Sequence, residues 1–264
     1  MNKTIATFLL AFFLVACDQH SQGHVVHGAE SHGVDPVNYA SAVANPARSD
    51  ADRARDAGRK PAEVLKFFGI TPGMKVFDMF SGGGYYAEIL THVVGDTGLV
   101  VAHTNETSLG YVGDEFNARY GDDRLPIVEI LMAENNELEL EVERFDAIIL
   151  VLGYHDLYWV APQQGWPKIN VTQLLTELHG SLKPGGILGI IDHYAETGAP
   201  RETGGTLHRI DASIVITELE AVGFELEAKS DLLRNMQDDH SKGVFDPTIR
   251  GRTDRFMLRF RKQD

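Results

Sequence analysis

The alternation of apolar and polar residues predicts strands that alternate with helices along most of the chain. Short apolar runs with almost no charge, such as residues 145–152, are typical of parallel strands that are covered on both faces. Apolar residues at helical spacing predict the segments between these runs to be helices. The expected strands are 75–80, 99–103, 127–132, 145–152, 187–191, 224–228 and 256–260, and the expected helices are 51–60, 62–68, 85–94, 112–120, 171–182 and 208–222.

This order predicts an α/β fold with a doubly wound, mostly parallel, seven-stranded sheet. Ser49 or Asp50 can cap the first helix, and Pro61 suits the first turn of the second, so a helical extension precedes the sheet. Helix 171–182 is followed by Lys183-Pro184-Gly185-Gly186, which is a typical stop signal. A polar segment, 235–252, but no helix separates the last two strands, so we expect them to form an antiparallel hairpin at one edge.

The segment 74–90 organises this pattern because it contains a strand, a glycine turn and a helix in that order. The turn is Ser81-Gly82-Gly83-Gly84, and Asp78 stands near the carboxyl end of the strand. Glycines let a ligand approach the backbone closely, and the helix that follows presents unpaired N–H groups to it. Asp78 can accept hydrogen bonds from a ligand over the turn.

Several interpretations of this turn are open. Gly82 and Gly84 with Ala87 at the third position fit the looser dinucleotide fingerprint. Asp78 with the same two glycines also fits the spacing of the S-adenosylmethionine motif. A phosphate-binding P-loop is excluded because Tyr85 follows Gly84 where that motif requires lysine. A glycine turn without any ligand remains the fourth interpretation.

Composition limits the class of partner. The chain has 264 residues, 43% hydrophobic and 23% charged, which is typical of one large globular domain or two small ones. The formal net charge of -14 and the pI of about 5.2 argue against a nucleic-acid partner, because such binding depends largely on Lys and Arg. Arg250-Gly251-Arg252 is a local basic patch. A small-molecule substrate is therefore expected, and the sequence carries no signal for oligomeric state.

The amino terminus has the features of an export signal. Lys3 precedes an apolar run, 5–16, that is too short to span a bilayer and has the length of a signal-peptide core. Its end, Leu14-Val15-Ala16-Cys17, resembles the lipobox of bacterial lipoproteins. That resemblance implies a diacylated Cys17 that anchors the chain to a membrane of the cell envelope, facing the periplasm. Asp18 resembles the signal that retains enteric lipoproteins in the inner membrane.

Cys17 is also the only cysteine, so an intramolecular disulfide or a thiolate metal cluster is excluded. Residues 17–37 are rich in Gly, Ser, Gln and His, and such a composition is typical of a flexible tether. Its histidines can capture metal loosely, but a solvated spacer is the expected role; they are His20, His24, His27 and His32. The predicted organisation is a signal peptide at 1–16, a tether at 17–37 and one domain at 38–264.

Several motifs together resemble class I S-adenosylmethionine-dependent methyltransferases over roughly residues 60–264. They are VFDMFSGGGYY at 76–86, LKPGG followed by ILGIIDHY at 182–194, and the strand order that closes in a hairpin. GYHDLYW at 153–159, LHRID at 207–211 and DDHSKGVFDPTIRGRTDRF at 238–256 resemble a narrower group of exported bacterial predicted methyltransferases. The resemblance implies S-adenosylmethionine as cofactor and a Rossmann-like methyltransferase fold.

The resemblance also implies which residues contact cofactor and substrate. The loop for the methionine part of the cofactor is Asp78, Ser81, Gly82, Gly83 and Gly84; the ribose side is Thr104 and Asn105; the adenine side is Glu134 and Asn135; and the substrate side is Tyr154, His155 and Asp156. Two positions depart from the family. Phe80 stands at the first glycine of the motif, and Thr104 replaces the carboxylate that holds the ribose. Losing that carboxylate costs about 1–2 kcal/mol of binding, or about tenfold in affinity.

His155 beside Asp156 is the predicted general base, because imidazole next to a carboxylate suits proton removal near neutral pH. His103, His155 and His193 all fall at expected strand ends and could converge on zinc or iron. Their spacing matches no metal motif, so we predict separate polar contacts and no metal site. Further histidines beside carboxylates occur in 208–211 and 238–240.

The sequence therefore predicts an S-adenosylmethionine-dependent methyltransferase, a transferase for an unidentified small molecule at the cell envelope. The alternative is a non-catalytic or repurposed methyltransferase fold that binds a nucleotide-like or metal ligand. A NAD-dependent enzyme is a third possibility. The absence of an acidic residue at the end of the second strand disfavours it, because that residue holds the ribose of NAD.

Overall fold

The computed structural model describes residues 37–263, and the chain from Val37 onward forms one compact unit. The predicted signal peptide and tether lie outside the described residues, apart from Val37. The helices are α1 (Tyr39–Val43), α2 (Asp50–Arg59), α3 (Pro61–Phe68), α4 (Tyr85–Val94), α5 (Glu106–Val112), α6 (Asp114–Tyr120), α7 (Val171–Ser181), α8 (Thr203–Leu207) and α9 (Ala212–Ala221). The strands are β1 (Lys75–Met79), β2 (Leu99–Thr104), β3 (Val128–Met132), β4 (Phe145–Val151), β5 (Leu182–His193), β6 (Phe224–Ser230) and β7 (Arg255–Lys262). Among these helices, none combines the length and the apolar character that a bilayer crossing requires.

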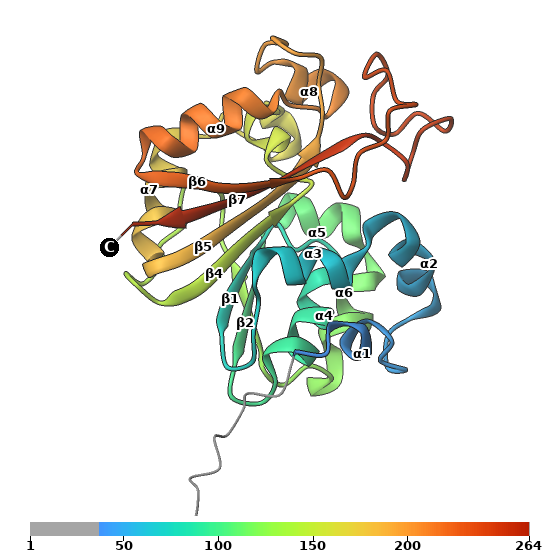
Figure 1. Ribbon diagram of the computed structural model, residues 1–264, viewed down its shortest axis with the longest axis vertical. Coiled ribbons are helices and arrows are strands. Elements are labelled where there is room, and N and C mark those ends of the chain that lie inside the picture. The colour runs from blue at the N-terminus through green and yellow to red at the C-terminus, as the bar shows by residue number, and fades with distance from the viewer. Residues whose placement is uncertain (1–36, 264) are drawn as a thin grey trace, which may run out of the picture. The chain divides into compact units, whose positions relative to one another are not determined.

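One seven-stranded sheet runs through the domain in the order β3-β2-β1-β4-β5-β7-β6 (Figure 1). The first five strands in that order are parallel, whereas β7 is antiparallel to both β5 and β6. This confirms the predicted fold and the carboxyl-terminal hairpin. The chain reverses its winding direction between β1 and β4, and ligands of such sheets bind outside the carboxyl ends of the strands at this switch point.

Two hydrophobic cores cover the two faces of the sheet, with α3 and α4 on one face and α7 and α9 on the other (Figure 1). Successive residues of β1 alternate between them: Val76 belongs to the core of α3 and α4, and Phe77 to the core of α7 and α9. Both side chains are fully buried. The uncharged runs in the sequence follow from this two-sided burial.

Predicted helix ends are partly confirmed. The Ser49 side chain accepts the backbone N–H of Asp52 at 3.1 Å and caps α2, and Pro61 is the first residue of α3. The helix predicted at 112–120 is confirmed as α6, which begins two residues later, but the prediction missed α5, which Gly113, with φ of +60°, separates from α6. The turn at 183–186 lies within β5 as a bulge: Leu182 pairs with Phe145 and Ile187 pairs with Ala147.

The helix predicted at 208–222 begins later, at Ala212, where the Asp211 side chain accepts the backbone N–H of Ser213 at 2.8 Å. His208 instead ends α8 in the left-handed conformation, with φ of +53°. The residues before Ala212 are therefore free to cross the carboxyl end of the sheet rather than continue α9.

Buried ion pairs fix α6 over the carboxyl end of β1. Arg119 of α6 pairs with Asp52 of α2 at 2.6 Å and with the fully buried Glu88 of α4. A second pair, between Arg48 and Asp56 at 2.7 Å, is extended by the Tyr85 hydroxyl, which donates to Asp56 at 2.5 Å. The amino-terminal extension and α6 are thereby tied to the helix that follows the glycine turn.

Candidate functional site

A cavity of about 370 Å³ lies at the carboxyl ends of β1 and β4, where the winding of the sheet reverses. Its volume is within the range of small-molecule sites, roughly 300–1,000 Å³. The lining residues come from the loops after both strands and from four later or intervening segments: Phe80, Gly82, Ser108, Tyr111, Val112, Leu152, Gly153, Asp156, Trp159, Trp166, His208 and Phe245. The position is the one that the fold predicts for a ligand.

Three residues other than glycine that line this cavity have left-handed backbone conformations. The φ angles are +54° at Phe80, +58° at Leu152 and +53° at His208. Each costs about 1–2 kcal/mol relative to an ordinary conformation, and such strained residues concentrate at functional sites. Phe80 thus keeps the backbone shape that glycine would give, while its ring packs on Trp166 at 5.7 Å and on His103 at 5.5 Å.

Only one of the three turn glycines faces the cavity. A Cβ atom on Gly82, whose φ is +56°, would meet no heavy atom of residues 37–263 within 4 Å. A Cβ on Gly84 would lie 2.3 Å from the hydroxyl oxygen of Tyr120, and one on Gly83 would lie 2.7 Å from a carboxylate oxygen of Glu115. Helix α6 therefore covers the part of the turn next to α4.

Buried polar atoms without hydrogen-bond partners surround the covered part of the turn. Within the described residues they include Asp78 Oδ2 and Thr104 Oγ1, together with Ser81 Oγ and Tyr120 Oη, which lie near each other without forming a well-aligned hydrogen bond. Burial raises the pKa of Asp78 to about 8, and the Ala87 backbone N–H and the Arg59 charge offset this only in part. Because native proteins leave few buried polar atoms unpaired, this group is a candidate set of contacts for a polar ligand.

The residues predicted for the ribose and adenine do not line the cavity. Thr104 and Asn105 are fully buried at the end of β2. Asn105 accepts the backbone N–H of Ser108 at 2.8 Å, which caps α5, and its amide donates to Asn135 Oδ1 at 3.3 Å. Glu134 is half-buried beside this pair. The side chain of Asn105 is therefore held by the α5 cap and by Asn135 and does not face the cavity.

The predicted base, His155, lies between two carboxylates. Its Nδ1 is 2.7 Å from Asp192 Oδ1 at the end of β5, and its Nε2 is 3.3 Å from Asp156 Oδ1. Burial lowers the pKa of His155, but the attraction of Asp192 and Asp156 outweighs burial and raises the pKa to about 10. A ring that is already protonated at neutral pH cannot accept a proton, so this geometry disfavours His155 as the base.

The two neighbours predicted with His155 point to different places. Asp156 lines the cavity, and although burial opposes ionisation, His155 and His208 keep its pKa well below the usual range. Tyr154 is fully buried, and its hydroxyl donates to Glu218 at 2.8 Å, so it does not line this cavity. Of the three predicted substrate residues, Asp156 is therefore the one exposed to a ligand.

His208 is a site residue that the sequence showed only as a histidine near a carboxylate, without a predicted role in the site. Its Nδ1 lies 3.3 Å from Asp156 Oδ1, and its ring packs edge-on against Phe245 at 4.9 Å. It reaches this place because α8 packs closely on the turn η2 (His155–Tyr158): a Cβ on Gly204 would be 2.4 Å from the His155 carbonyl oxygen. Two features of the sequence could have identified His208: its place in the LHRID motif, and the two glycines at 204 and 205 that precede the motif.

The other histidines predicted at strand ends have separate partners. His103 Nε2 is 3.0 Å from the Ala133 carbonyl oxygen, and burial lowers the pKa of His103 to about 4. His193 Nδ1 is 2.7 Å from Thr253 Oγ1, and burial together with the nearby charge of His155 lowers the pKa of His193. In this arrangement His103, His155 and His193 do not form one ligand set.

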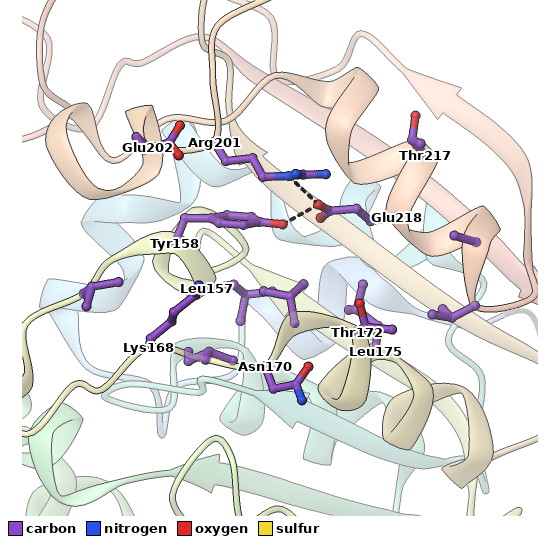
Figure 2. A pocket seen from close by; sticks show the side chains of 15 residues that line it. Leu157, Tyr158, Lys168, Asn170, Thr172, Leu175, Arg201, Glu202, Thr217 and Glu218 are labelled. Carbon is purple, nitrogen blue, oxygen red and sulfur yellow. Dashed lines mark hydrogen bonds and ion pairs between the residues drawn. The ribbon is translucent and has the colours of Figure 1, made fainter.

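A second cavity, of about 910 Å³, lies on the other side of η2, between α7 and α9 (Figure 2). Figure 2 shows Arg201 and Tyr158 pointing toward Glu218, which accepts hydrogen bonds from both, the Arg201 bond at 2.8 Å. The lining residues of the two cavities do not overlap within 37–263. Because the larger cavity lacks the glycine turn, the smaller one is the candidate site for a cofactor.

Comparison with known proteins supports a methyltransferase fold. Residues 43–115, which include the glycine turn, match the family of protein-L-isoaspartate(D-aspartate) O-methyltransferases. A methyltransferase from Aquifex aeolicus described as dependent on S-adenosylmethionine is 22% identical, with a TM-score of 0.56 over 86% of this chain and 99% of that one. One from Mesorhizobium loti is 15% identical, with a TM-score of 0.50 over 83% of this chain and all of that one. A search of curated proteins found no match.

These identities establish the shared fold and leave the reaction open. The cyclase SpnF matches with a TM-score of 0.50 and 18% identity, over 83% of this chain and 85% of that one. A cyclase and methyltransferases therefore have the same fold, as expected when function depends on the site rather than the architecture. The function of this chain has to be argued from its cavity.

Proposed function

We propose that this chain is an S-adenosylmethionine-dependent methyltransferase that acts on a small molecule. The observation that carries this proposal is the group of unpaired buried polar atoms around the glycine turn, at the switch point of a methyltransferase fold. The match of residues 43–115 to a methyltransferase family covers the same turn and supports the assignment. The net charge of -14 disfavours a nucleic-acid acceptor.

When bound, the cofactor supplies a methyl group on a sulfonium, and transfer requires an acceptor held in line with it. Phe80, Trp159 and Trp166 give the cavity an apolar wall that excludes water from the reacting atoms. Asp156 and His208 form its polar wall and are the groups available to orient an acceptor. His155 positions Asp156 rather than serving as the base.

Cofactor binding in this proposal includes movement of α6. The Tyr120 hydroxyl lies over Gly84, part of the loop that the resemblance assigns to the methionine part of the cofactor. Burial, with the nearby Asp78, raises the pKa of Tyr120, so the hydroxyl stays neutral and can donate to a ligand once displaced. Asp78 would then be the acceptor available to the amino group of the cofactor.

Calorimetric titration of the chain with S-adenosylmethionine and S-adenosylhomocysteine tests the proposal. Gly82→Asp is the informative variant, because the site is open and aspartate tolerates a left-handed backbone better than most residues. Gly251→Asp is the matched control: its φ is +77°, and a Cβ there also meets no described atom within 4 Å. We expect saturable heat that disappears in Gly82→Asp and persists in Gly251→Asp. A chain that gives no heat at high micromolar cofactor would refute the proposal.

A specific observation favours one alternative, a repurposed fold that binds a nucleotide-like ligand without turnover. Tyr120 covers Gly84, and Thr104 stands where the family has a carboxylate for the ribose. Under this alternative the site binds S-adenosylmethionine or adenosine, but no labelled methyl group is transferred to thiol, amine or hydroxyl acceptors. Transfer of labelled methyl to any of these acceptors would exclude it.

We propose in addition that Cys17 anchors the chain to the cell envelope, on the periplasmic side. The support is the sequence 14–17 after a short apolar run. Metabolic labelling with a radioactive fatty acid should mark the wild-type chain and not Cys17→Ser. Equal labelling of both chains would contradict the anchor.

A further inference from the structure

We propose that His155, Asp156 and His208 bind one divalent transition-metal ion on the polar wall of the smaller cavity. One ligand atom from each residue lies within 4.8 Å of the other two. His155 and Asp156 belong to η2, and His208 follows α8, so two separate segments supply the set. Nitrogen, nitrogen and carboxylate oxygen make a ligand set typical of zinc and of non-haem iron.

The distances within the set fit a shared ion, although the His208 contact also meets the geometry of a long hydrogen bond. Asp156 Oδ1 is 3.3 Å from His155 Nε2 and 3.3 Å from His208 Nδ1. Ligands at about 2.1 Å from a tetrahedral metal lie about 3.4 Å from each other. Charge-assisted hydrogen bonds between imidazolium and carboxylate are shorter, about 2.7–2.9 Å. Both contacts to Asp156 therefore have the length of an edge of a coordination tetrahedron.

Asp192 acts as the outer partner that a metal-bound histidine requires. Its Oδ1 lies 2.7 Å from His155 Nδ1, a distance typical of a charge-assisted hydrogen bond. Asp192 also accepts the backbone N–H groups of His155 at 2.8 Å and of His193 at 2.6 Å, so its carboxylate is fixed at the end of β5. With the Nδ1 proton held by Asp192, an ion that binds at Nε2 displaces the second proton of the ring to solvent.

The structure also keeps one side of the set accessible. The side chains of Asp156 and His208 are 27% and 24% exposed, and both line the cavity, whereas His155 is buried behind them. Three protein ligands with an accessible side are typical of a catalytic rather than a structural zinc site. The ion would bind the oxygen or sulfur of the acceptor there and lower its pKa. This role rests on the proposed methyl transfer, but metal binding itself does not.

Zinc titration of the full chain, treated with chelator and dialysed, tests the site by calorimetry. Wild type should bind one more equivalent than His208→Ala. His240→Ala is the matched control, because His240 is 21% exposed, also left-handed with φ of +64°, and 3.0 Å from a single carboxylate, Asp254. It should bind as wild type does. The histidines in 18–37 are present in all three proteins, so any zinc that they bind contributes equally to the three titrations.

Two further measurements keep the test decisive if His208→Ala is less stable. Asp192→Asn should keep the stoichiometry but weaken affinity by about 10–100-fold, as loss of an outer partner does. Cobalt in place of zinc should give the visible absorption of a low-coordinate nitrogen and oxygen site in wild type and not in Asp156→Asn.

Equal stoichiometry and affinity in wild type and His208→Ala would overturn the proposal. Equally effective displacement of zinc by magnesium would also overturn it, since magnesium prefers sites made of oxygen ligands. None of these readings uses S-adenosylmethionine. A chain that binds zinc but no cofactor would therefore refute the proposed function alone, and the reverse result would refute the metal site alone.

Discussion

Asp78→Asn removes a carboxyl group whose burial makes ionisation costly in the folded chain. The Asp78 side chain is 3% exposed, and burial raises its pKa from 3.8 to about 8. A group whose pKa is raised on folding contributes its full stability below the unfolded pKa and loses it as the pH rises to the folded pKa. The loss is about 1.36 kcal/mol per pH unit above the unfolded pKa. At pH 7 the ionisation of Asp78 therefore lowers the unfolding free energy of the wild-type chain by about 4 kcal/mol.

Urea denaturation of both proteins between about pH 5 and about pH 8 measures this term. The unfolding free energy of Asp78→Asn minus that of wild type should grow by about 4 kcal/mol over this range, because the asparagine does not titrate. Taking the difference removes the contribution of every other titrating group that the substitution leaves unchanged. A difference that stays constant with pH would refute the reasoning.

The same experiment in saturating S-adenosylmethionine links stability to function. The amino group of the bound cofactor carries positive charge next to Asp78 in the proposed complex, which favours the ionised carboxylate. The pH dependence of the difference should therefore shrink, and the variant should lose its advantage. This is the expected pattern for a residue that is kept for binding at a cost to stability.

Other substitutions probe the cover and the interior of the site. Gly84→Ala should lower the unfolding free energy by about 1–3 kcal/mol in urea denaturation, since its φ is +76° and its Cβ would meet Tyr120; an unchanged midpoint would contradict the observed packing. Arg119→Met should cost about 3 kcal/mol because it leaves the buried Glu88 with one partner fewer, and a thermal midpoint equal to wild type would show that the pair is not formed. His103 has a folded pKa of about 4, so the chain should lose about 3 kcal/mol as the pH falls from 6.5 to 4, whereas His103→Gln should lack this loss; parallel pH profiles would disprove it.

The sequence predicted the sheet because burial on both faces leaves a clear pattern. Runs such as 145–152 contain almost no polar residues, and each of the seven predicted strands overlaps an observed one. The prediction missed α5 and placed the start of α9 too early, and in both places a residue with positive φ interrupts the helical pattern. Gly113 ends α5, and His208 ends α8, although the apolar spacing continues through both positions.

The site was only partly predictable. Some of its residues follow adjacent strands of the sheet, whereas others meet only because segments far apart in the sequence pack together. Gly82 and Asp156 follow adjacent strands, so the sheet topology alone brings them to one end. His208 lies 52 residues after Asp156, and their contact depends on the packing of α8 against η2. That packing needs a glycine at 204, which a sequence pattern shows only as a poor helix former.

Several features that lower the stability of the folded chain lie together at the cavity end of the sheet. Phe80, Leu152 and His208 come from three separate segments, and each costs about 1–2 kcal/mol in backbone strain. With the unfavourable ionisation of Asp78, the sum is comparable to the whole stability of a typical domain, about 5–15 kcal/mol. Strain of this size persists only where surrounding contacts impose it. A ligand that pairs with Asp78, or an ion that binds His208, would recover part of this energy only in the folded state, so each should raise the thermal midpoint on its own.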